Sequence, residues 1–279
     1  MSDVVPPAGP PPGQPPGQPS SARPGPRAGA RITAVTSGKG GVGKTFVAAN
    51  LAAALARAGQ RVLVLDADLG LANLDVVLNL AARVTLHDVF TGRATLAEAL
   101  QTAPGGFMVL LAGSGLVEYS RMTPEVRDKL LDIIAQVRPR FDHVLLDTGA
   151  GISDVVLFTV SLADEVLIVV TPEPTSLTDA YATIKVLAST QAARPVRLLV
   201  NQTQRRGEGR NVRTQLQQVL DRFVNGGLPK PLKLELLGEV PQDAAVRDSI
   251  LRRQLLLEHL PGSPAALAIA AAAGKLLPP

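Results

Sequence analysis

A glycine-rich stretch between residues 38 and 45 constrains the fold of this chain more than any other feature. It fits the pattern G-x-x-x-x-G-K-[ST], follows the apolar run at residues 32–35, and opens a helical pattern over residues 46–58. Its glycines allow a tight turn whose N–H groups point at phosphate oxygens, and the helix adds the positive end of its dipole. The sequence therefore predicts a nucleotide site with these contacts: Gly38, Gly40, Gly41, Val42, Gly43, Lys44 and Thr45.

Acidic residues follow two apolar runs that are typical of strands buried on both faces. Residues 61–65 lead to Asp66 and Asp68, and residues 141–146 lead to Asp147. Parallel strands bring their carboxyl ends to one edge of the sheet, where open α/β sheets bind ligands. We therefore expect these three carboxylates to lie beside the glycine-rich stretch.

The residue types at this edge suit a nucleotide with its magnesium ion. Lys44 would reach the β- and γ-phosphates, and the Thr45 hydroxyl would ligate Mg²⁺. Asp147 would hold the ion through water. Residues 148–152 include two glycines and are predicted to form a flexible loop that senses the γ-phosphate.

One polar residue indicates which base the site would accept. Asn201 follows the apolar run at residues 196–200, which is predicted to be a strand. Its carboxamide carries both a donor and an acceptor and could pair with N6 and N7 of adenine. This favours ATP over GTP, because guanine would be better met by a carboxylate.

Composition limits the other functions open to the chain. The absence of cysteine excludes disulfides and Cys-ligated Fe–S or zinc centres, and an aromatic content of 3% argues against aromatic platforms for nucleic acid.

Residues 1–30 hold ten of the 23 prolines and are predicted to be a disordered tail. Residues 31–279 are predicted to form one domain, a doubly wound, mainly parallel sheet flanked by helices. No apolar N-terminal segment resembles a signal peptide, so a cytoplasmic location is expected.

Lys39, a second lysine within the loop, gives the chain a family resemblance. Together with Gly43 and Lys44 it resembles the deviant Walker A loop of the MinD/ParA-type P-loop ATPases. Within that family, LDADLGLANLD at residues 65–75 and DTGAGI at residues 147–152 are most similar to the FlhG/FleN group of flagellar number regulators. PEPTSLTDAY, at residues 172–181, is similar to the same group.

This resemblance implies a role for each matched residue. Lys39 would cross a dimer interface and neutralise charge on the other subunit's nucleotide, so hydrolysis would require an ATP-bound homodimer. Asp68 would orient the attacking water, which makes Lys39, Lys44 and Asp68 the expected catalytic residues. Asp66 would hold its loop and the metal shell, alongside Thr45 and Asp147. The family also implies contacts to the base from the segment that holds Pro241 and Gln242.

The implied function is an ATP-dependent dimerising switch, a slow ATPase that controls flagellar number or placement. Its expected partners are flagellar assembly or transcription components, and recruitment to the cell pole or membrane periphery fits such a role. The N-terminal pattern with which FlhG proteins engage the GTPase FlhF is absent from this sequence.

Two alternatives remain open. A ParA-like partition ATPase would bind nonspecific DNA, with Arg205, Arg206, Arg210 and Arg213 as candidate phosphate contacts, although such a charge run is more often a solvated face. A MinD-like division-site factor would bind membranes through a basic terminal helix. The predicted helix at residues 263–277 has no basic face, so strong autonomous membrane binding is not expected.

Overall fold

The computed structural model describes residues 29–70, 72–113, 122–190 and 194–277. Most of the predicted tail lies outside these residues. Ala30, which we had placed in the tail, is only 1% exposed, and its backbone N–H donates to the carbonyl of Arg138 at 2.7 Å. The folded part therefore includes Ala30, one residue earlier than expected.

The described residues form an eight-stranded sheet with the order β3-β4-β2-β5-β1-β6-β7-β8. Every neighbouring pair is parallel except β3 and β4, so the predicted doubly wound, mainly parallel sheet is confirmed. The short antiparallel edge strand β3 was not predicted. The strands are β1 Arg31–Ser37, β2 Val62–Ala67, β3 Leu100–Thr102, β4 Met108–Leu110, β5 His143–Ala150, β6 Glu165–Val170, β7 Val196–Thr203 and β8 Leu234–Pro241.

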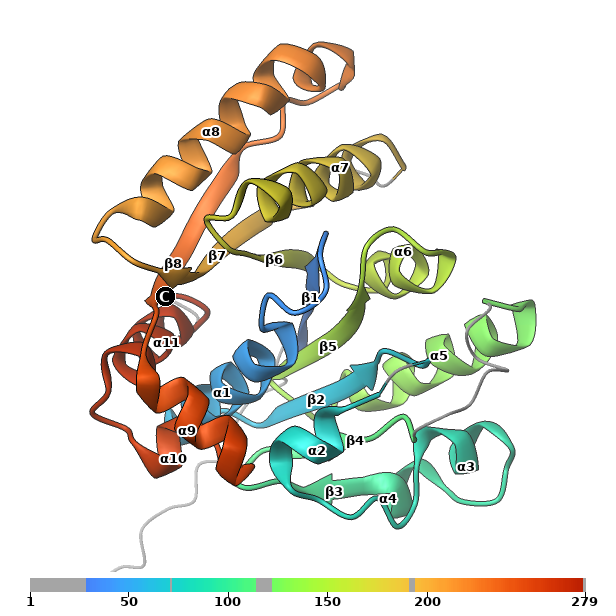
Figure 1. Cartoon of the computed structure of the whole chain (residues 1–279). Helices are drawn as coiled ribbons and strands as arrows, with labels where there is room; N and C mark the ends of the chain where they lie inside the picture. Colours follow the sequence, from blue (N-terminus) through green and yellow to red (C-terminus); the bar gives the residue numbers. More distant parts are fainter. Residues whose placement is uncertain (1–28, 71, 114–121, 191–193, 278–279) are drawn as a thin grey trace, which may run out of the picture.

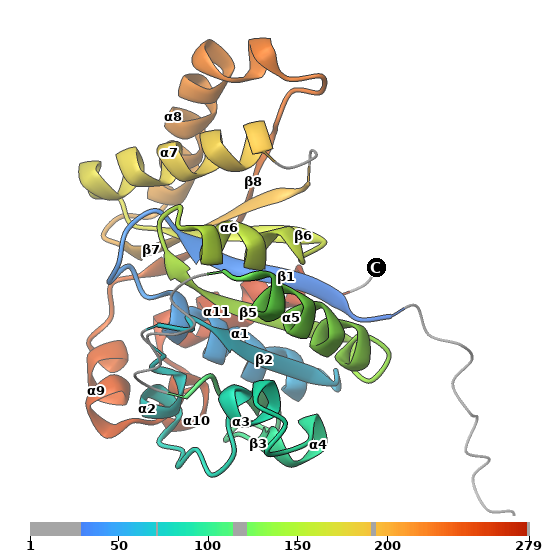
Figure 2. The ribbon, with the colours of Figure 1, turned by 90° about the vertical axis from the view of Figure 1, so that its right-hand side faces the viewer.

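Helices cover both faces of this sheet (Figures 1 and 2). One face carries α1 Lys44–Arg57, α2 Leu74–Leu78, α9 Ala244–Arg252, α10 Leu256–His259 and α11 Pro264–Gly274. The other carries α3 Leu86–Phe90, α4 Leu96–Ala99, α5 Pro124–Val137, α6 Asp154–Ser161, α7 Pro174–Thr190 and α8 Glu208–Phe223. Each face has its own aliphatic core, which explains why the central strands read as unbroken apolar runs.

The terminal helix α11 packs within the domain. Ala265, Ala266, Ile269, Ala272 and Ala273 are all buried, and the helix lies against α1 and β8. Among the described residues, no helix is both long and apolar enough to cross a membrane.

A buried carboxylate joins three strands at the edge where they begin. Glu165, the first residue of β6, is 1% exposed and accepts hydrogen bonds from Arg31 at 2.6 Å and from the Thr33 hydroxyl at 2.8 Å. Arg197 of β7 lies 3.5 Å from the same carboxylate. This cluster fixes the register of β1, β6 and β7 from the side chains as well as from the backbone.

Replacing Glu165 with glutamine should lower the free energy of unfolding by about 3 kcal/mol, because breaking a buried ion pair leaves the remaining charges uncompensated. Urea unfolding followed by circular dichroism measures this change. Glu235→Gln is the matched control, since Glu235 pairs with the same Arg197 but its side chain is 64% exposed. An exposed pair contributes about 1 kcal/mol or less, so equal losses in both variants would contradict the prediction.

Candidate nucleotide site

The glycine-rich stretch links β1 to α1, as predicted. Gly41 has φ 79° and Gly43 has φ 96°, values in the left-handed region that side chains rarely adopt. Gly43 is the N-cap of α1, so the helix begins at Lys44 and directs its free N–H groups and its dipole at the loop. The loop therefore has the backbone geometry of an anion-binding site.

Gly38 brings this loop against the backbone of α7. A Cβ at Gly38 would lie 2.1 Å from the carbonyl carbon of Asp179 and 2.5 Å from the backbone nitrogen of Ala180. Only glycine fits this approach, because the obstructing atoms belong to the main chain of a helix. The first part of α7 thus sets the position of the phosphate loop.

Gly38→Ala should displace the loop and destabilise the protein by about 1–3 kcal/mol, the range for an overpacked site. The affinity for an ATP analogue should fall as well. Titration calorimetry measures this affinity, and urea unfolding measures the stability. Gly40→Ala is the control for stability, because a Cβ there would meet no atom within 4 Å. If Gly38→Ala unfolds at the same urea concentration as Gly40→Ala, the contact with α7 does not constrain the loop.

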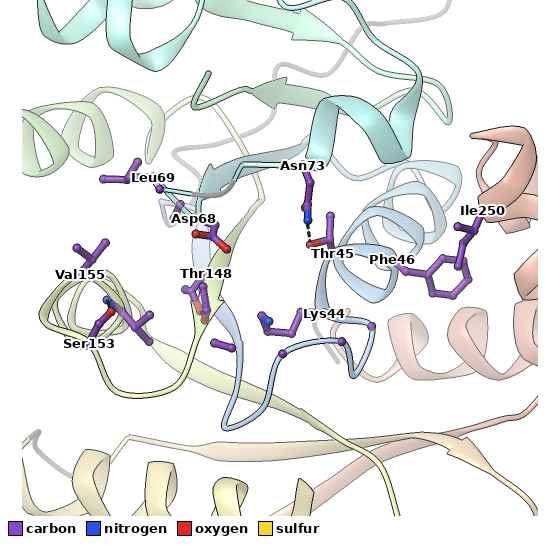
Figure 3. Close-up of a pocket in the computed structure, with 18 residues that line it drawn as sticks. Lys44, Thr45, Phe46, Asp68, Leu69, Asn73, Thr148, Ser153, Val155 and Ile250 are labelled. Carbon is purple, nitrogen blue, oxygen red and sulfur yellow. Dashed lines mark hydrogen bonds between the residues drawn. The ribbon is translucent and has the colours of Figure 1, made fainter. Parts of the chain in front are cut away.

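A cavity of about 950 Å³ opens above the loop (Figure 3). It is bounded by the phosphate loop, the ends of β2 and β5, and the start of α6. Lys44 points toward the side that holds Asp68 and Thr148, while Thr45 lies on the opposite side beside Asn73. The cavity is large enough for a nucleotide, and its polar groups converge at the loop.

Charges in this region are strongly coupled. Burial lowers the pKa of Lys44, an effect that Asp147 and Asp68 oppose. Burial also raises the pKa of Asp147 to about 7, against the lowering effects of the Thr45 hydroxyl and Lys44. Asp66 is the partner of Asp147 in the ladder between β2 and β5, and burial, followed by this neighbouring carboxylate, raises its pKa well above the usual range. A cation would relieve this accumulation of acids.

The residues present fit a magnesium ion. Oδ1 of Asp147 is buried and has no hydrogen-bond partner among the described residues. Together with the nearby Thr45 hydroxyl it supplies oxygen donors, the kind that Mg²⁺ prefers. In the part of the chain that the structure describes, no three His, Cys, Asp or Glu side chains form a metal cluster.

Asp66 and Asp68 occupy different positions relative to β2. Asp66 lies inside β2, which runs two residues further than predicted, and its carboxylate accepts from the backbone N–H groups of Asp68 at 3.3 Å and Leu74 at 3.4 Å. It therefore holds the loop, as expected. Asp68 follows the strand and lines the cavity, with its carboxylate 3.4 Å from where a Cβ of Gly149 would stand.

Lys39 faces away from this cavity. Its ammonium group donates to Glu173 at 3.0 Å and to the Thr175 hydroxyl at 2.9 Å, at the start of α7. The side chain remains 38% exposed, and Lys39 is not among the described residues that line the cavity. Within one subunit, the charge of Lys39 is thus directed at the rim of the site and not into it.

The three residues expected at the base lie together at the ends of β7 and β8. Asn201 is 7% exposed and donates to the carbonyl of Val42 in the phosphate loop at 2.8 Å. Pro241 is paired with Thr203, and the backbone of Gln242 donates to the same residue at 2.9 Å. Asn201, Pro241 and Gln242 do not line the described part of the cavity, so their contact with adenine stays a prediction.

One local expectation is wrong. Residues 148–150 complete β5 instead of forming a flexible loop, because β2 and β1 are long enough to pair with them: Thr148 pairs with Ala67, and Ala150 pairs with Ser37. The glycine at 149 does not interrupt the strand. Only residues 151 and 152 of the predicted loop lie outside regular structure.

Sequence reasoning missed several residues at the site. Asn73 is the N-cap residue of α2 without a side-chain capping bond; its Oδ1 accepts from the Thr45 hydroxyl at 3.3 Å, and the residue lines the cavity. Phe46 and Ile250 form an apolar wall on the side of α1 and α9 (Figure 3). The 52% exposure of Ile250, an apolar residue late in the chain, is a signal that only the structure reveals.

Comparison with known proteins agrees with this geometry. Residues 33–256 match the CobQ/CobB/MinD/ParA nucleotide-binding domain. The chain is 42% identical over 246 residues to the antiactivator FleN of Pseudomonas aeruginosa, covering 88% of this chain and 86% of FleN. It is 32% identical to the flagellum site-determining protein YlxH of Helicobacter pylori, covering 88% of this chain and 82% of YlxH.

A solved structure supports the same assignment. The septum site-determining protein MinD of Pyrococcus horikoshii, in complex with Mg-ADP, superposes with a TM-score of 0.72 at 27% identity. The match covers 88% of this chain and 96% of MinD. The fold, the phosphate loop and these matches lead to one conclusion: this chain belongs to the MinD/ParA family of nucleotide-binding proteins.

Proposed function

We propose that this protein is an ATP-dependent dimerising switch, a slow ATPase that controls the number or placement of flagella. One observation carries the proposal: Lys39 belongs to the phosphate loop but is directed away from its own cavity, whereas Asp68 lines that cavity. A charge at this position on the rim is available to a nucleotide that approaches from another subunit. The similarity to FleN and to YlxH, whose name assigns it to flagellum siting, supports the flagellar role.

Each residue of the site has a distinct task in this proposal. The backbone of the loop and Lys44 bind the β- and γ-phosphates, and Thr45 and Asp147 hold the magnesium ion. The ion, when bound, neutralises charge on the phosphate oxygens. Asp68 accepts a proton from, and orients, the water that attacks the γ-phosphate. Lys39 of a second subunit neutralises the charge that develops on the transferred group, so turnover follows dimerisation.

Nucleotide state would reach a partner through α7. This helix touches the loop at Gly38 and holds Lys39 through Glu173 and Thr175. If Lys39 moves to a second subunit, these contacts break and the start of α7 is released. The exposed face of α7 is then the surface on which flagellar assembly or transcription components would recognise the ATP-bound dimer.

The flagellar role is tested by deleting the chain in its own organism and counting flagella per cell by electron microscopy. We expect a changed number or position with normal division septa. The parental chain should restore the count, and a Lys39→Ala chain expressed at the same level should not. An unchanged count in the deletion strain would contradict the flagellar role.

A partition ATPase is the second candidate, because Arg205, Arg206 and Arg210 are exposed around the start of α8. That role predicts ATP-dependent binding to nonspecific DNA with a steep dependence on salt concentration. Affinity that is independent of both ATP and salt would exclude it. The packed position of α11 gives no support to a division-site factor that binds membranes through its terminal helix.

A further inference from the structure

An apolar groove lies at the end of the molecule opposite the nucleotide site. It has a volume of about 550 Å³ and an aliphatic lining contributed by the starts of β6 and β7, the last turn of α7 and the segment after α8. The principal apolar lining residues are Val166, Leu187, Val196, Leu228 and Leu232. A groove of this size and composition is suited to two or three aliphatic side chains.

Two cationic residues border the groove. Lys230 is exposed, and Arg194 is half-buried with one guanidinium nitrogen donating to the carbonyl of Val160 at 2.7 Å. No acidic residue is among its described lining residues. The groove therefore favours an occupant that combines a short aliphatic segment with a carboxylate.

The N-terminal segment of this chain has this chemistry. Among residues 1–28, Asp3 is the sole acidic residue, and it is followed directly by Val4 and Val5. The rest of the segment is rich in proline and glycine and offers no comparable pair of branched aliphatic residues. We propose that Asp3, Val4 and Val5 dock into this groove of the same molecule, with the valines on its aliphatic lining and the carboxylate near Lys230 and Arg194.

The distances allow this docking within one molecule. The chain enters the described fold at the edge where the strands begin, which is also where α7 ends (Figure 2). Ala34 of β1 is the ladder partner of Val166 in the groove, so Ala30 lies about 13 Å away along one strand and about 5 Å across the sheet. Residues 6–28 span up to about 70 Å as polyproline II, which is more than enough.

Because the docking residues are covalently linked to the domain, a weak contact is enough to populate the docked state. A linker makes docking an intramolecular step with an effective concentration set by its length and stiffness, in the millimolar range where the linker is short and flexible. A few aliphatic contacts and one exposed ion pair, each contributing little alone, then populate the docked state. Docking would bury part of the groove at one end of α7, the helix whose other end holds Lys39.

The chain lacks cysteine, so Ser2→Cys in the full-length protein allows a single spin label beside the docking residues. We expect the label to broaden the methyl resonances of Leu187, Val196 and Leu228 selectively. The double variant Val4→Ser, Val5→Ser should lose this selective broadening. Broadening that is spread over the surface, or that survives loss of both valines, would overturn the proposal.

Charge exchange provides a matched test that leaves the core intact. Lys230→Glu alone and Asp3→Lys alone should each weaken the selective broadening, and the two together should restore it. Mixing spin-labelled chains at natural isotope abundance with unlabelled, isotope-enriched chains separates cis from trans docking. Broadening in that mixture would show that the segment binds a second copy and would overturn docking within one molecule. None of these readouts depends on ATP, so they are independent of the proposed switch.

Discussion

Lys39→Ala should lower the rate of ATP turnover by a factor of about 10³–10⁵, the contribution of a charge supplied in trans during phosphoryl transfer. Nucleotide affinity of the monomer should stay at the parental level, because the Lys39 ammonium bonds to Glu173 and Thr175 and is directed out of its own cavity. Phosphate release under saturating ATP measures the first quantity. Fluorescence titration with a labelled ATP analogue measures the second.

Moving the Lys39 side chain away from α7 costs little free energy. Its pair with Glu173 is exposed on both sides, at 38% and 60%, and exposed pairs contribute about 1 kcal/mol or less. A triphosphate on a second subunit is a stronger attraction than this local pair. The side chain can therefore leave α7 when a dimer forms.

Lys233→Ala is the control for the loss of one positive charge, since Lys233 is exposed and precedes the edge strand β8. It should turn over ATP at the parental rate. If the Lys39→Ala protein hydrolyses ATP at the rate of this control, Lys39 does not act on the nucleotide of a second subunit. A parallel loss of affinity and turnover would instead mean that Lys39 binds nucleotide within its own subunit.

The elements that sequence reasoning located well are those set by local patterns. The helix α5 and the strand β6 follow directly from such patterns. Pro124 begins α5 where its missing N–H does no harm, and the β6 run is apolar because both faces of the sheet are covered. The glycine-rich loop was equally clear, because its strand, turn and helix are contiguous in sequence.

Contacts between distant segments could not be foreseen in the same way. Gly38 meets the backbone of Asp179, and Asn201 meets the carbonyl of Val42, and more than a hundred residues separate the members of each pair. The edge strand β3 forms through its pairing with β4, and its sequence has no apolar run that would predict a strand. Such features depend on tertiary packing, which periodicity does not encode.

Strand ends were the other source of error, and they matter for the site. We expected the second strand to end at residue 65 and the fifth strand to end in Asp147, but pairing between β2 and β5 continues through Asp66 and Asp147 to Thr148. The two carboxylates are therefore neighbours within the sheet, where burial raises the pKa of each. Asp68, just beyond the strand, is the acid that reaches the cavity.

Asp68→Ala should trap an ATP-bound dimer. Loss of a positioned general base lowers turnover by about 10²–10⁴-fold, while the groups that bind the phosphates, Lys44 and Thr45, remain in place. Dimer formation with ATP should therefore be unimpaired and its dissociation slow. Light scattering after size exclusion measures the mass with and without ATP, and single-turnover hydrolysis measures the chemical step.

Asp128→Ala, an exposed carboxylate on α5, is the control for removal of one negative charge and should cycle between states like the parental protein. The unfolding midpoint of Asp68→Ala should show that the loop is still folded, because Asp66 continues to hold the backbone at residues 68 and 74. If Asp68→Ala hydrolyses ATP at the parental rate, another group activates the water. If it fails to dimerise with ATP, the carboxylate acts in assembly and not in the chemical step.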